Sequence, residues 1–160
     1  MIIILMGVSG SGKTTIGHLL ADNLGWTFYD GDDYHPSSNV ENLKKGIALT
    51  DTERWPWLAT LRKIIENTIT KKEHAIIACS ALKQSYREYL AGNCESVRFV
   101  YLKGDYDLIR QRVNKRKGHF IDANLLLSQF ETLEEPRDAF IIDVSHSPES
   151  IVYRIKEAFL

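Results

Sequence analysis

Short apolar runs alternate along this chain with segments in which apolar residues recur at every third or fourth position. The apolar runs predict five strands, over Ile2–Met6, Trp26–Asp30, His74–Cys79, Val97–Leu102 and Ala139–Val144. The segments with helical spacing predict helices over Lys13–Leu24, Trp57–Thr70, Lys83–Ala91, Asp105–Arg116, Ala123–Thr132 and Pro148–Phe159. Strands that are apolar throughout and separated by helices are typical of a parallel sheet covered on both faces, so we predict an α/β fold.

The composition indicates one domain, over residues 1–160, with a substantial core. The chain has 160 residues, of which 44% are hydrophobic. Its net charge of −1 argues against a general nucleic-acid binder, which carries a basic excess. The two cysteines are too few for a disulfide framework, and the first apolar run is too short to span a membrane. With no signal-peptide pattern, we expect a cytoplasmic protein that binds neither nucleic acid nor membrane.

The loop after the first predicted strand reads GVSGSGKT and matches the pattern G-x-x-x-x-G-K-[ST] in full. Its glycines let the backbone curl so that N–H groups point at phosphate oxygens, and the following helix N-terminus adds partial positive charge. Lys13 would reach the β- and γ-phosphates, and the Thr14 hydroxyl could bind Mg²⁺. We predict a nucleoside triphosphate site, with a flexible Gly/Ser turn as the alternative. The residues predicted to bind the nucleotide here are Gly7, Ser9, Gly10, Ser11, Gly12, Lys13, Thr14 and Thr15.

An acidic segment, YDGDDYHP, ends the second predicted strand. Ligands of parallel sheets bind beyond the carboxyl ends of the strands, so we expect Asp30 and Asp32 near the phosphates. A carboxylate there could hold Mg²⁺ through water or accept the proton of an attacking hydroxyl. Two other interpretations remain: an acidic turn that caps the next helix, and a transition-metal site formed by His35 with the aspartates.

Basic residues lie in two further segments. Arg54 lies in LTDTERWPWL, where Asp51 or Thr52 is expected to cap the next helix, and a fixed guanidinium can bind a carboxylate through two hydrogen bonds. Lys83 and Arg87 are four residues apart and are expected on one helix face. Such a pair suits an anionic or polyhydroxy substrate, but it is equally typical of a solvated basic face.

A third basic segment, RQRVNKRKGHF, carries Arg112 and Arg116 before Gly118. A basic helix that ends at glycine predicts a lid, over residues 112–124, that closes over phosphates. The alternatives are a charged surface segment and a nucleic-acid patch, and the short segment and the net charge disfavour the patch.

Together these stretches resemble the gluconate kinase (gluconokinase) family, within the wider group of P-loop kinases related to nucleoside monophosphate kinases. The matching stretches, in the family's order, are GVSGSGKT, DGDDYHPSSN, GIALTDTERWPWL, CSALKQSYREYL, YLKGDYDLI, RKGHF and SQFETLEEP. The resemblance implies a three-layer P-loop kinase fold with a five-stranded parallel sheet, helices on both faces and a small helical lid. It also implies phosphorylation of D-gluconate at its 6-hydroxyl by ATP with Mg²⁺, and a homodimer.

The resemblance further implies roles for residues at matching positions. Lys13, Asp32 and Arg116 would act in catalysis, and Thr14 and Asp30 would serve the metal. The other implied contacts are Arg112 with the nucleotide, and Asp32, His35, Arg54, Lys83, Arg87 and Gln129 with the sugar acid.

The chain departs from the family's pattern in a few places. Asn42 stands where lysine is usual, and Glu53 where aspartate is commoner. The loop after LEEP is short, and with DVSHSPES it lies where we expect the adenine, within residues 136–148. The short loop bears on selectivity for the base rather than on phosphate transfer.

Other P-loop proteins are the alternatives. A shikimate kinase could place similar residues after the second strand, but that family carries Gly-Gly-Gly after the third strand, where this chain has ACSALK. Nucleotide and nucleoside kinases are weaker candidates. A GTP-driven switch would need N-K-x-D, and the Asn-Lys of this chain lies in NKRK. A pure binding module would leave the acceptor-side residues without a role.

Overall fold

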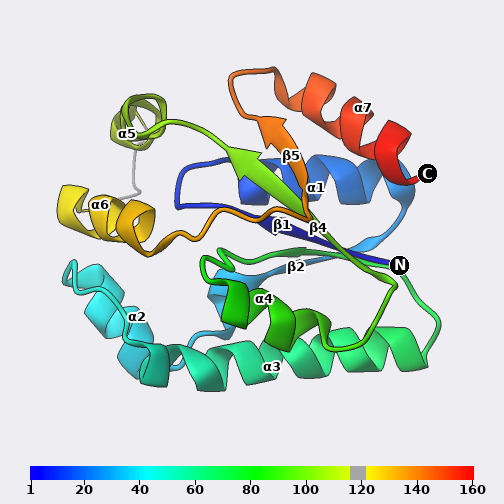
Figure 1. The fold of residues 1–160 in the computed structure, drawn as a ribbon, viewed down its shortest axis with the longest axis horizontal. Helices are drawn as coiled ribbons and strands as arrows, with labels where there is room; N and C mark the ends of the chain where they lie inside the picture. Colours follow the sequence, from blue (N-terminus) through cyan, green and yellow to red (C-terminus); the bar gives the residue numbers. More distant parts are fainter. Residues whose placement is uncertain (116–121) are drawn as a thin grey trace.

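The fold is built on a sheet of five parallel strands. The computed structural model describes residues 1–115 and 122–160. The strands are β1 (Ile2–Met6), β2 (Thr27–Asp30), β3 (Ala75–Ala78), β4 (Val97–Lys103) and β5 (Phe140–Asp143). They pair in the order β2-β3-β1-β4-β5, and every pairing is parallel (Figure 1). The strands predicted from the sequence are confirmed, with bounds that agree to within one residue.

Helices connect the strands. They are α1 (Lys13–Leu24), α2 (Ser37–Lys44), α3 (Asp51–Thr70), α4 (Gln84–Ala91), α5 (Tyr106–Lys115), α6 (Ala123–Thr132) and α7 (Pro148–Phe159), and a 3₁₀-helix, η1, covers Gly31–Tyr34. The apolar pattern does not predict η1 or α2, because these short segments are mostly polar and carry little periodicity. The other helices are confirmed in place.

The long helix α3 begins earlier than the sequence pattern predicts. Its N-cap is Thr50, so the expectation of a cap at Asp51 or Thr52 is wrong. The Thr50 hydroxyl accepts a hydrogen bond from the N–H of Glu53, and the Glu53 carboxylate accepts one from the N–H of Thr50 at 3.0 Å. This reciprocal capping box satisfies two donors that a helix start leaves open. Pro56 lies inside the helix, one residue before the start that the sequence pattern predicts.

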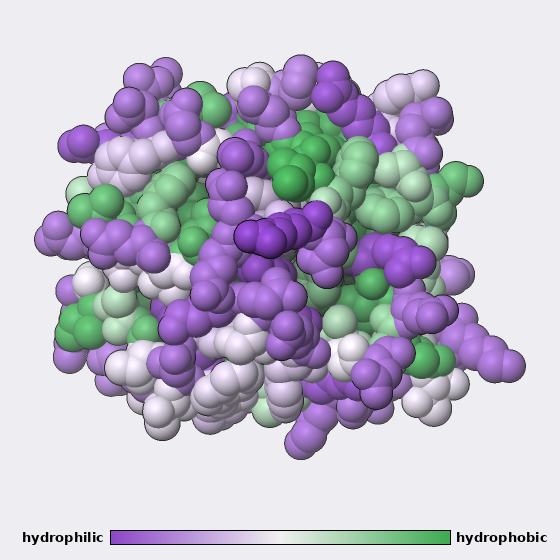
Figure 2. Space-filling view, viewed as in Figure 1, coloured by the Kyte–Doolittle hydropathy of each residue, from purple (hydrophilic) through white to green (hydrophobic). Residues whose placement is uncertain are grey.

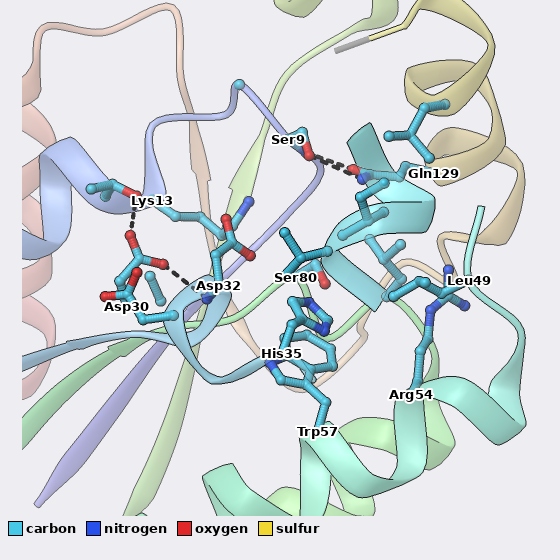
Figure 3. A pocket seen from close by; sticks show the side chains of 18 of the residues that line it. Ser9, Lys13, Asp30, Asp32, His35, Leu49, Arg54, Trp57, Ser80 and Gln129 are labelled. Carbon is cyan, nitrogen blue, oxygen red and sulfur yellow. Dashed lines mark hydrogen bonds between the residues drawn. The ribbon is translucent and has the colours of Figure 1, made fainter. Parts of the chain in front are cut away.

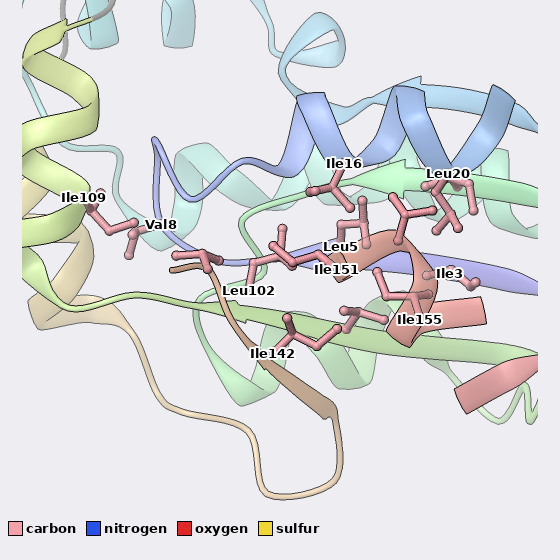
Figure 4. Close-up of a cluster of buried hydrophobic side chains, with 14 of the residues drawn as sticks. Ile3, Leu5, Val8, Ile16, Leu20, Leu102, Ile109, Ile142, Ile151 and Ile155 are labelled. Atoms are coloured by element: carbon pink, nitrogen blue, oxygen red, sulfur yellow. The ribbon is translucent and has the colours of Figure 1, made fainter. Parts of the chain in front are cut away.

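Helices cover both faces of the sheet, as predicted. The central strand β1 shows this most clearly, because all five of its side chains are buried. Ile2, Ile4 and Met6 join one cluster of buried side chains with residues of α3 and α4, whereas Ile3 and Leu5 join another with residues of α1 and α7. Figure 4 shows the second cluster, and Figure 1 shows the corresponding helices on opposite sides of the sheet.

The surface mixes polar and apolar side chains. Figure 2 shows hydrophilic residues over much of one face, with hydrophobic residues in separate patches between them. Within residues 1–115 and 122–160, no helix has both the length and the apolar character needed to cross a membrane.

The carboxyl ends of β1, β2 and β3 meet at one edge of the sheet. Ala78 of β3 pairs with Leu5 on one side and with Asp30 on the other. The glycine-rich loop leaves β1 at this edge, and η1 leaves β2 there. Gly31 permits the second exit, because a Cβ at this position would lie 2.4 Å from the carbonyl oxygen of Ala78. The fold therefore gathers the loops with the candidate chemistry at this edge.

Candidate active site

The loop from β1 to α1 curls around the side chain of Lys13. The Lys13 Nζ donates hydrogen bonds to the carbonyl oxygens of Gly7 and Val8, each at 2.9 Å. Gly10 has a φ of 81°, a left-handed value that favours glycine. A Cβ on Gly10 would also lie 2.4 Å from a methyl carbon of Val113 in α5. The loop thus has the tight curl that its sequence predicts for a phosphate cradle.

Asp30 connects the start of α1 to the turn after β2. Its Oδ2 accepts a hydrogen bond from the Thr14 hydroxyl at 2.9 Å, and its Oδ1 accepts one from the backbone N–H of Asp32 at 3.0 Å. The structure therefore brings together Thr14 and Asp30, the two residues predicted to serve a metal. Asp30 is also the N-cap of η1. This agrees with the alternative interpretation, in which an acidic turn caps the next helix. Among the described residues, no group of three or more His, Cys, Asp or Glu side chains could hold a metal ion.

A cavity of about 820 Å³ lies between the glycine-rich loop and the turn after β2. Lys13 and Thr14 line it on one side, and Asp32, His35 and Arg54 line it on the other. Figure 3 shows the Asp32 side chain directed toward Lys13. The volume is in the range of small-molecule sites. The glycine-rich loop and the acidic strand end therefore face one shared space, as the sequence predicts.

His35 packs against Trp57 in the wall of this cavity. The two rings stack with their centroids 4.1 Å apart, and the Trp57 indole N–H donates to the carbonyl oxygen of Gly31 at 2.7 Å. Burial, with the positive charge of Arg54 as a smaller cause, lowers the pKa of His35 to about 4. The imidazole is therefore neutral near pH 7.

Arg54 is held by a polar network at the start of α3. Its Nη1 donates to the Tyr86 hydroxyl at 3.0 Å, and that hydroxyl donates to the Asp51 carboxylate. Lys83 forms a salt bridge with the same carboxylate at 3.0 Å. The hydrogen bond from Tyr86, and then that from Lys83, lower the pKa of the Asp51 carboxyl. Arg54 lines the cavity, whereas Lys83 faces Asp51 and does not line it.

Arg87 lies outside the cavity, so the structure does not bring it together with His35, Arg54 and Gln129. Its side chain is only 3% exposed. The guanidinium donates to the carbonyl oxygens of Ala81, Leu82 and Glu134 at 2.7, 3.1 and 2.8 Å. It thereby joins α4 to the loop after β3 and to the segment after α6. Lys83 is the N-cap of α4 rather than a residue within it, so the pair does not form a basic helix face.

Replacing Arg87 with methionine should lower the free energy of unfolding by about 2–4 kcal/mol, because two buried carbonyl oxygens and one part-buried carbonyl oxygen lose a charged donor. Urea denaturation followed by circular dichroism measures this change. The matched control is Arg110→Met, a loss of the same charge on the exposed face of α5, which should alter stability by less than about 0.5 kcal/mol. Wild-type stability in the Arg87 variant would contradict the structural role.

Gln129 of α6 reaches the glycine-rich loop. Its side-chain oxygen accepts from the backbone N–H of Ser9 at 2.7 Å, and its amide donates to the Ser9 hydroxyl at 2.9 Å (Figure 3). Gln129 also lines the cavity. It therefore attaches α6 to the cradle at the place where a phosphate and an acceptor would meet.

A second cavity, of about 140 Å³, lies on the α5 and α7 side of the loop. It is lined by His146 and by five predicted nucleotide-binding residues, which are Gly10, Ser11, Gly12, Thr15 and Arg112. The Ser11 hydroxyl is buried and has no hydrogen-bond partner in the part of the chain that the structure describes. A buried hydroxyl without a partner is costly. Arg116 and much of the predicted lid lie outside the described residues.

Sequence reasoning missed two residues that organise the site, Asn39 and Tyr86. Asn39 of α2 donates to the backbone carbonyl of Glu53 at 2.9 Å, and Tyr86 of α4 binds Arg54. Their partners are far away in the sequence, so no local signal marks either pair. The structure also shows that Asn42 donates to the Glu53 carboxylate at 2.8 Å, so the two unusual residues noted above contact each other.

This chain is similar to known proteins along almost its whole length. The family model described as Shikimate kinase matches residues 9–158. The thermosensitive gluconokinase of Escherichia coli (strain K12) is 43% identical over 161 residues, which cover 98% of this chain and 86% of that protein.

Solved structures agree with the sequence comparison. A sugar kinase from Janibacter sp. HTCC2649, in an unliganded structure, has a TM-score of 0.90 at 42% identity, and the match covers 98% of this chain and 92% of that one. A gluconokinase from Sinorhizobium meliloti 1021 has a TM-score of 0.85 at 37% identity, covering 98% of this chain and 93% of that one. The predicted α/β fold of the P-loop kinases is therefore confirmed.

Proposed function

This chain belongs to the gluconokinase family, and from that membership we propose how its site acts. It transfers the γ-phosphoryl group of ATP to the 6-hydroxyl of D-gluconate, giving 6-phosphogluconate and ADP. The observation that carries the proposal is the shared cavity, which Lys13 of the cradle and Asp32 of the acidic turn both line. A donor phosphate and an acceptor alcohol can meet there without crossing solvent.

In the proposed reaction, the 6-hydroxyl oxygen of gluconate attacks the γ-phosphorus. The bond between this phosphorus and the oxygen that bridges to the β-phosphate breaks, and ADP leaves. Asp32 accepts the proton of the attacking hydroxyl. Lys13 exchanges its hydrogen bonds to the Gly7 and Val8 carbonyls for bonds to phosphate oxygens, and so stabilises the charge that develops on them.

Mg²⁺ would bind beside Thr14, together with the phosphates of ATP. The Thr14 hydroxyl and the Asp30 carboxylate lie 2.9 Å apart, and both are the hard oxygen donors that Mg²⁺ prefers. Asp30 suits a role through bound water, because its two oxygens already accept hydrogen bonds from Thr14 and Asp32. When bound, the ion neutralises charge on the β- and γ-phosphates.

The sugar acid would occupy the part of the cavity lined by Arg54, His35 and Gln129. Arg54 suits the carboxylate, because Tyr86 holds one nitrogen of the guanidinium and thereby orients the group. His35 is neutral and can donate a hydrogen bond without adding charge. An anchored carboxylate places the far end of the flexible polyol at a defined distance, which positions the reacting hydroxyl near Asp32.

The direct test is ADP release from the purified protein with MgATP, comparing gluconate, shikimate and nucleoside monophosphates. We expect ADP release with gluconate and a phosphorus NMR signal from 6-phosphogluconate. Shikimate kinase is the second candidate, because the family model of that name matches residues 9–158. ADP release with shikimate and none with gluconate would overturn the proposal in its favour.

Replacing Tyr86 with phenylalanine should raise the KM for gluconate about three- to tenfold, because Arg54 loses the oxygen that orients it. The KM for MgATP and kcat should change by less than about twofold, since Tyr86 does not line the cavity. Steady-state kinetics measure all three constants. The matched control is Tyr89→Phe on the same helix, where the ring is exposed. An equal rise in both variants would contradict the role of the Arg54 network.

The base of ATP is expected beside the second cavity, where Arg112 and His146 lie far from Ser11 in the sequence but line the same space. Three expectations stay predictions from the sequence: the lid over residues 112–124, the catalytic role of Arg116 and the homodimer.

A further inference from the structure

A neutral histidine carries its proton on either Nδ1 or Nε2, and the contacts of His35 select between these two forms. Asn39, in the first turn of α2, is 2% exposed. Its Nδ2 donates to the carbonyl oxygen of Glu53 at 2.9 Å and lies 3.3 Å from the Nδ1 of His35. A carbonyl oxygen can only accept, so the contact with Glu53 fixes which end of the Asn39 amide faces His35. That end is a donor, so Nδ1 must be the acceptor, and the proton is on Nε2.

The surroundings of His35 keep the ring neutral. One face of the imidazole stacks on Trp57, which removes water from that side. Burial accordingly lowers the pKa of the ring to about 4, and Arg54 adds to the effect. The charged side chains that line the same cavity are Lys13 at the start of α1, Asp30 at the end of β2, Asp32 and Asp33 from η1, Lys44 from α2 and Arg54 from α3.

We propose that Asn39 is a positioning residue, which keeps the proton of His35 on Nε2 so that the neutral ring donates a hydrogen bond to an oxygen of the sugar acid. The opposite form would present an acceptor to substrate oxygens and would repel a carboxylate. The identity of the substrate in this inference rests on the proposed function, whereas the state of the ring does not.

The start of α3 holds Asn39 in place. The capping box fixes the backbone of Glu53 against Thr50, and the Glu53 carbonyl then receives the Asn39 amide. One turn along α2, Asn42 donates to the Glu53 carboxylate at 2.8 Å. Two asparagines therefore bind the same glutamate, but only Asn39 also contacts His35. This difference supplies a matched pair of variants.

The first experiment determines which ring nitrogen of His35 carries the proton. The full chain, labelled with ¹⁵N-histidine and free of substrate, is studied by long-range ¹H–¹⁵N NMR, and the loss of one signal set in His35→Gln assigns His35 among the five histidines. We expect the pattern of the Nε2–H form, unchanged from about pH 8 to about pH 5. A proton on Nδ1, or titration of His35 near its ordinary pKa, would overturn the inference.

The second experiment replaces Asn39, the residue proposed to set the position of the proton on His35. In Asn39→Asp the carboxylate can only accept, so it should draw the proton to Nδ1 or stabilise the imidazolium, and the pKa of His35 should rise. The KM for gluconate should increase about three- to tenfold at about pH 8, with kcat changed by less than about twofold. Asn42→Asp, the same chemical change next to Glu53, should leave the NMR pattern of His35 as in the wild type. An Nε2–H pattern that persists in Asn39→Asp would overturn the role of Asn39.

Two safeguards keep these outcomes separate. If Asn39→Asp does not fold, Asn39→Ala removes the donor without adding charge, and the NMR spectrum should then show both neutral forms of His35. If the wild type shows the Nε2–H form but does not phosphorylate gluconate, the proposed function fails on its own account. If it phosphorylates gluconate with His35 protonated on Nδ1, only the present inference fails.

Discussion

Asparagine in place of Asp32 should lower the turnover of gluconate phosphorylation at least about a hundredfold, the usual scale for the loss of a general base. Asp32 lines the cavity opposite the glycine-rich loop, where an attacking hydroxyl would need a proton acceptor. Its backbone N–H, not its side chain, binds Asp30, so the substitution leaves that contact intact. The binding of MgATP should therefore stay within about threefold of the wild type.

The measurement is kcat from coupled ADP release, together with calorimetric titration of MgATP. Asp33→Asn is the matched control, because Asp33 follows Asp32 in η1 and carries the same charge at the same cavity. It should retain turnover within about threefold of the wild type. If Asp32→Asn turned over gluconate at nearly the wild-type rate, Asp32 would have no part in the proton transfer. An equal loss in both variants would indicate that only the total negative charge of the turn matters.

Alanine in place of Lys13 should lower kcat/KM for MgATP at least about a thousandfold, because a charged donor to the transferred phosphoryl group disappears from a preorganised site. The Lys13 Nζ also binds the Gly7 and Val8 carbonyls at 2.9 Å, so the substitution loosens the cradle itself. Binding and turnover should therefore both suffer, in contrast to Asp32→Asn, where turnover alone falls.

Calorimetric titration of MgATP and single-turnover kinetics separate these two losses. Lys63→Ala is the control for the loss of one lysine, because Lys63 is exposed on α3 and does not line the cavity. Its kinetic constants should be unchanged within about twofold. A Lys13→Ala variant that binds MgATP and phosphorylates gluconate normally would show that the glycine-rich loop does not hold the triphosphate.

The prediction for Lys83 and Arg87 shows the limit of inference from local spacing. Lys83 and Arg87 are four residues apart, which suggests one helix face, but Lys83 caps the helix and Arg87 points into the protein. Nothing in the spacing reveals that the carbonyl oxygens of Ala81, Leu82 and Glu134 need a donor. Whether an arginine binds substrate or backbone depends on which acceptors the folded chain leaves around it.

Much of the remaining site could be predicted, because its signals are local. The motif GVSGSGKT encodes a loop conformation in its own glycines, and the position of the acidic residues after β2 follows from the rule that ligands of a parallel sheet bind beyond the carboxyl ends of its strands. By contrast, the network of Arg54, Tyr86 and Asp51 joins α3 to α4 across the sequence. The contact between Asn39 and His35 was not predicted either, because the carbonyl oxygen of Glu53 at the start of α3 holds the Asn39 amide in place.

The sequence by itself determined the five strands, the covered sheet, the phosphate loop and the family of this kinase, because each depends on short-range periodicity or on a contiguous motif. Only the tertiary structure decided which polar side chains face the shared cavity and which donate hydrogen bonds to backbone carbonyl oxygens. The physical reason is that a hydrogen bond is satisfied by whichever partner packing brings within about 3 Å, and packing depends on the whole chain rather than on neighbours in sequence.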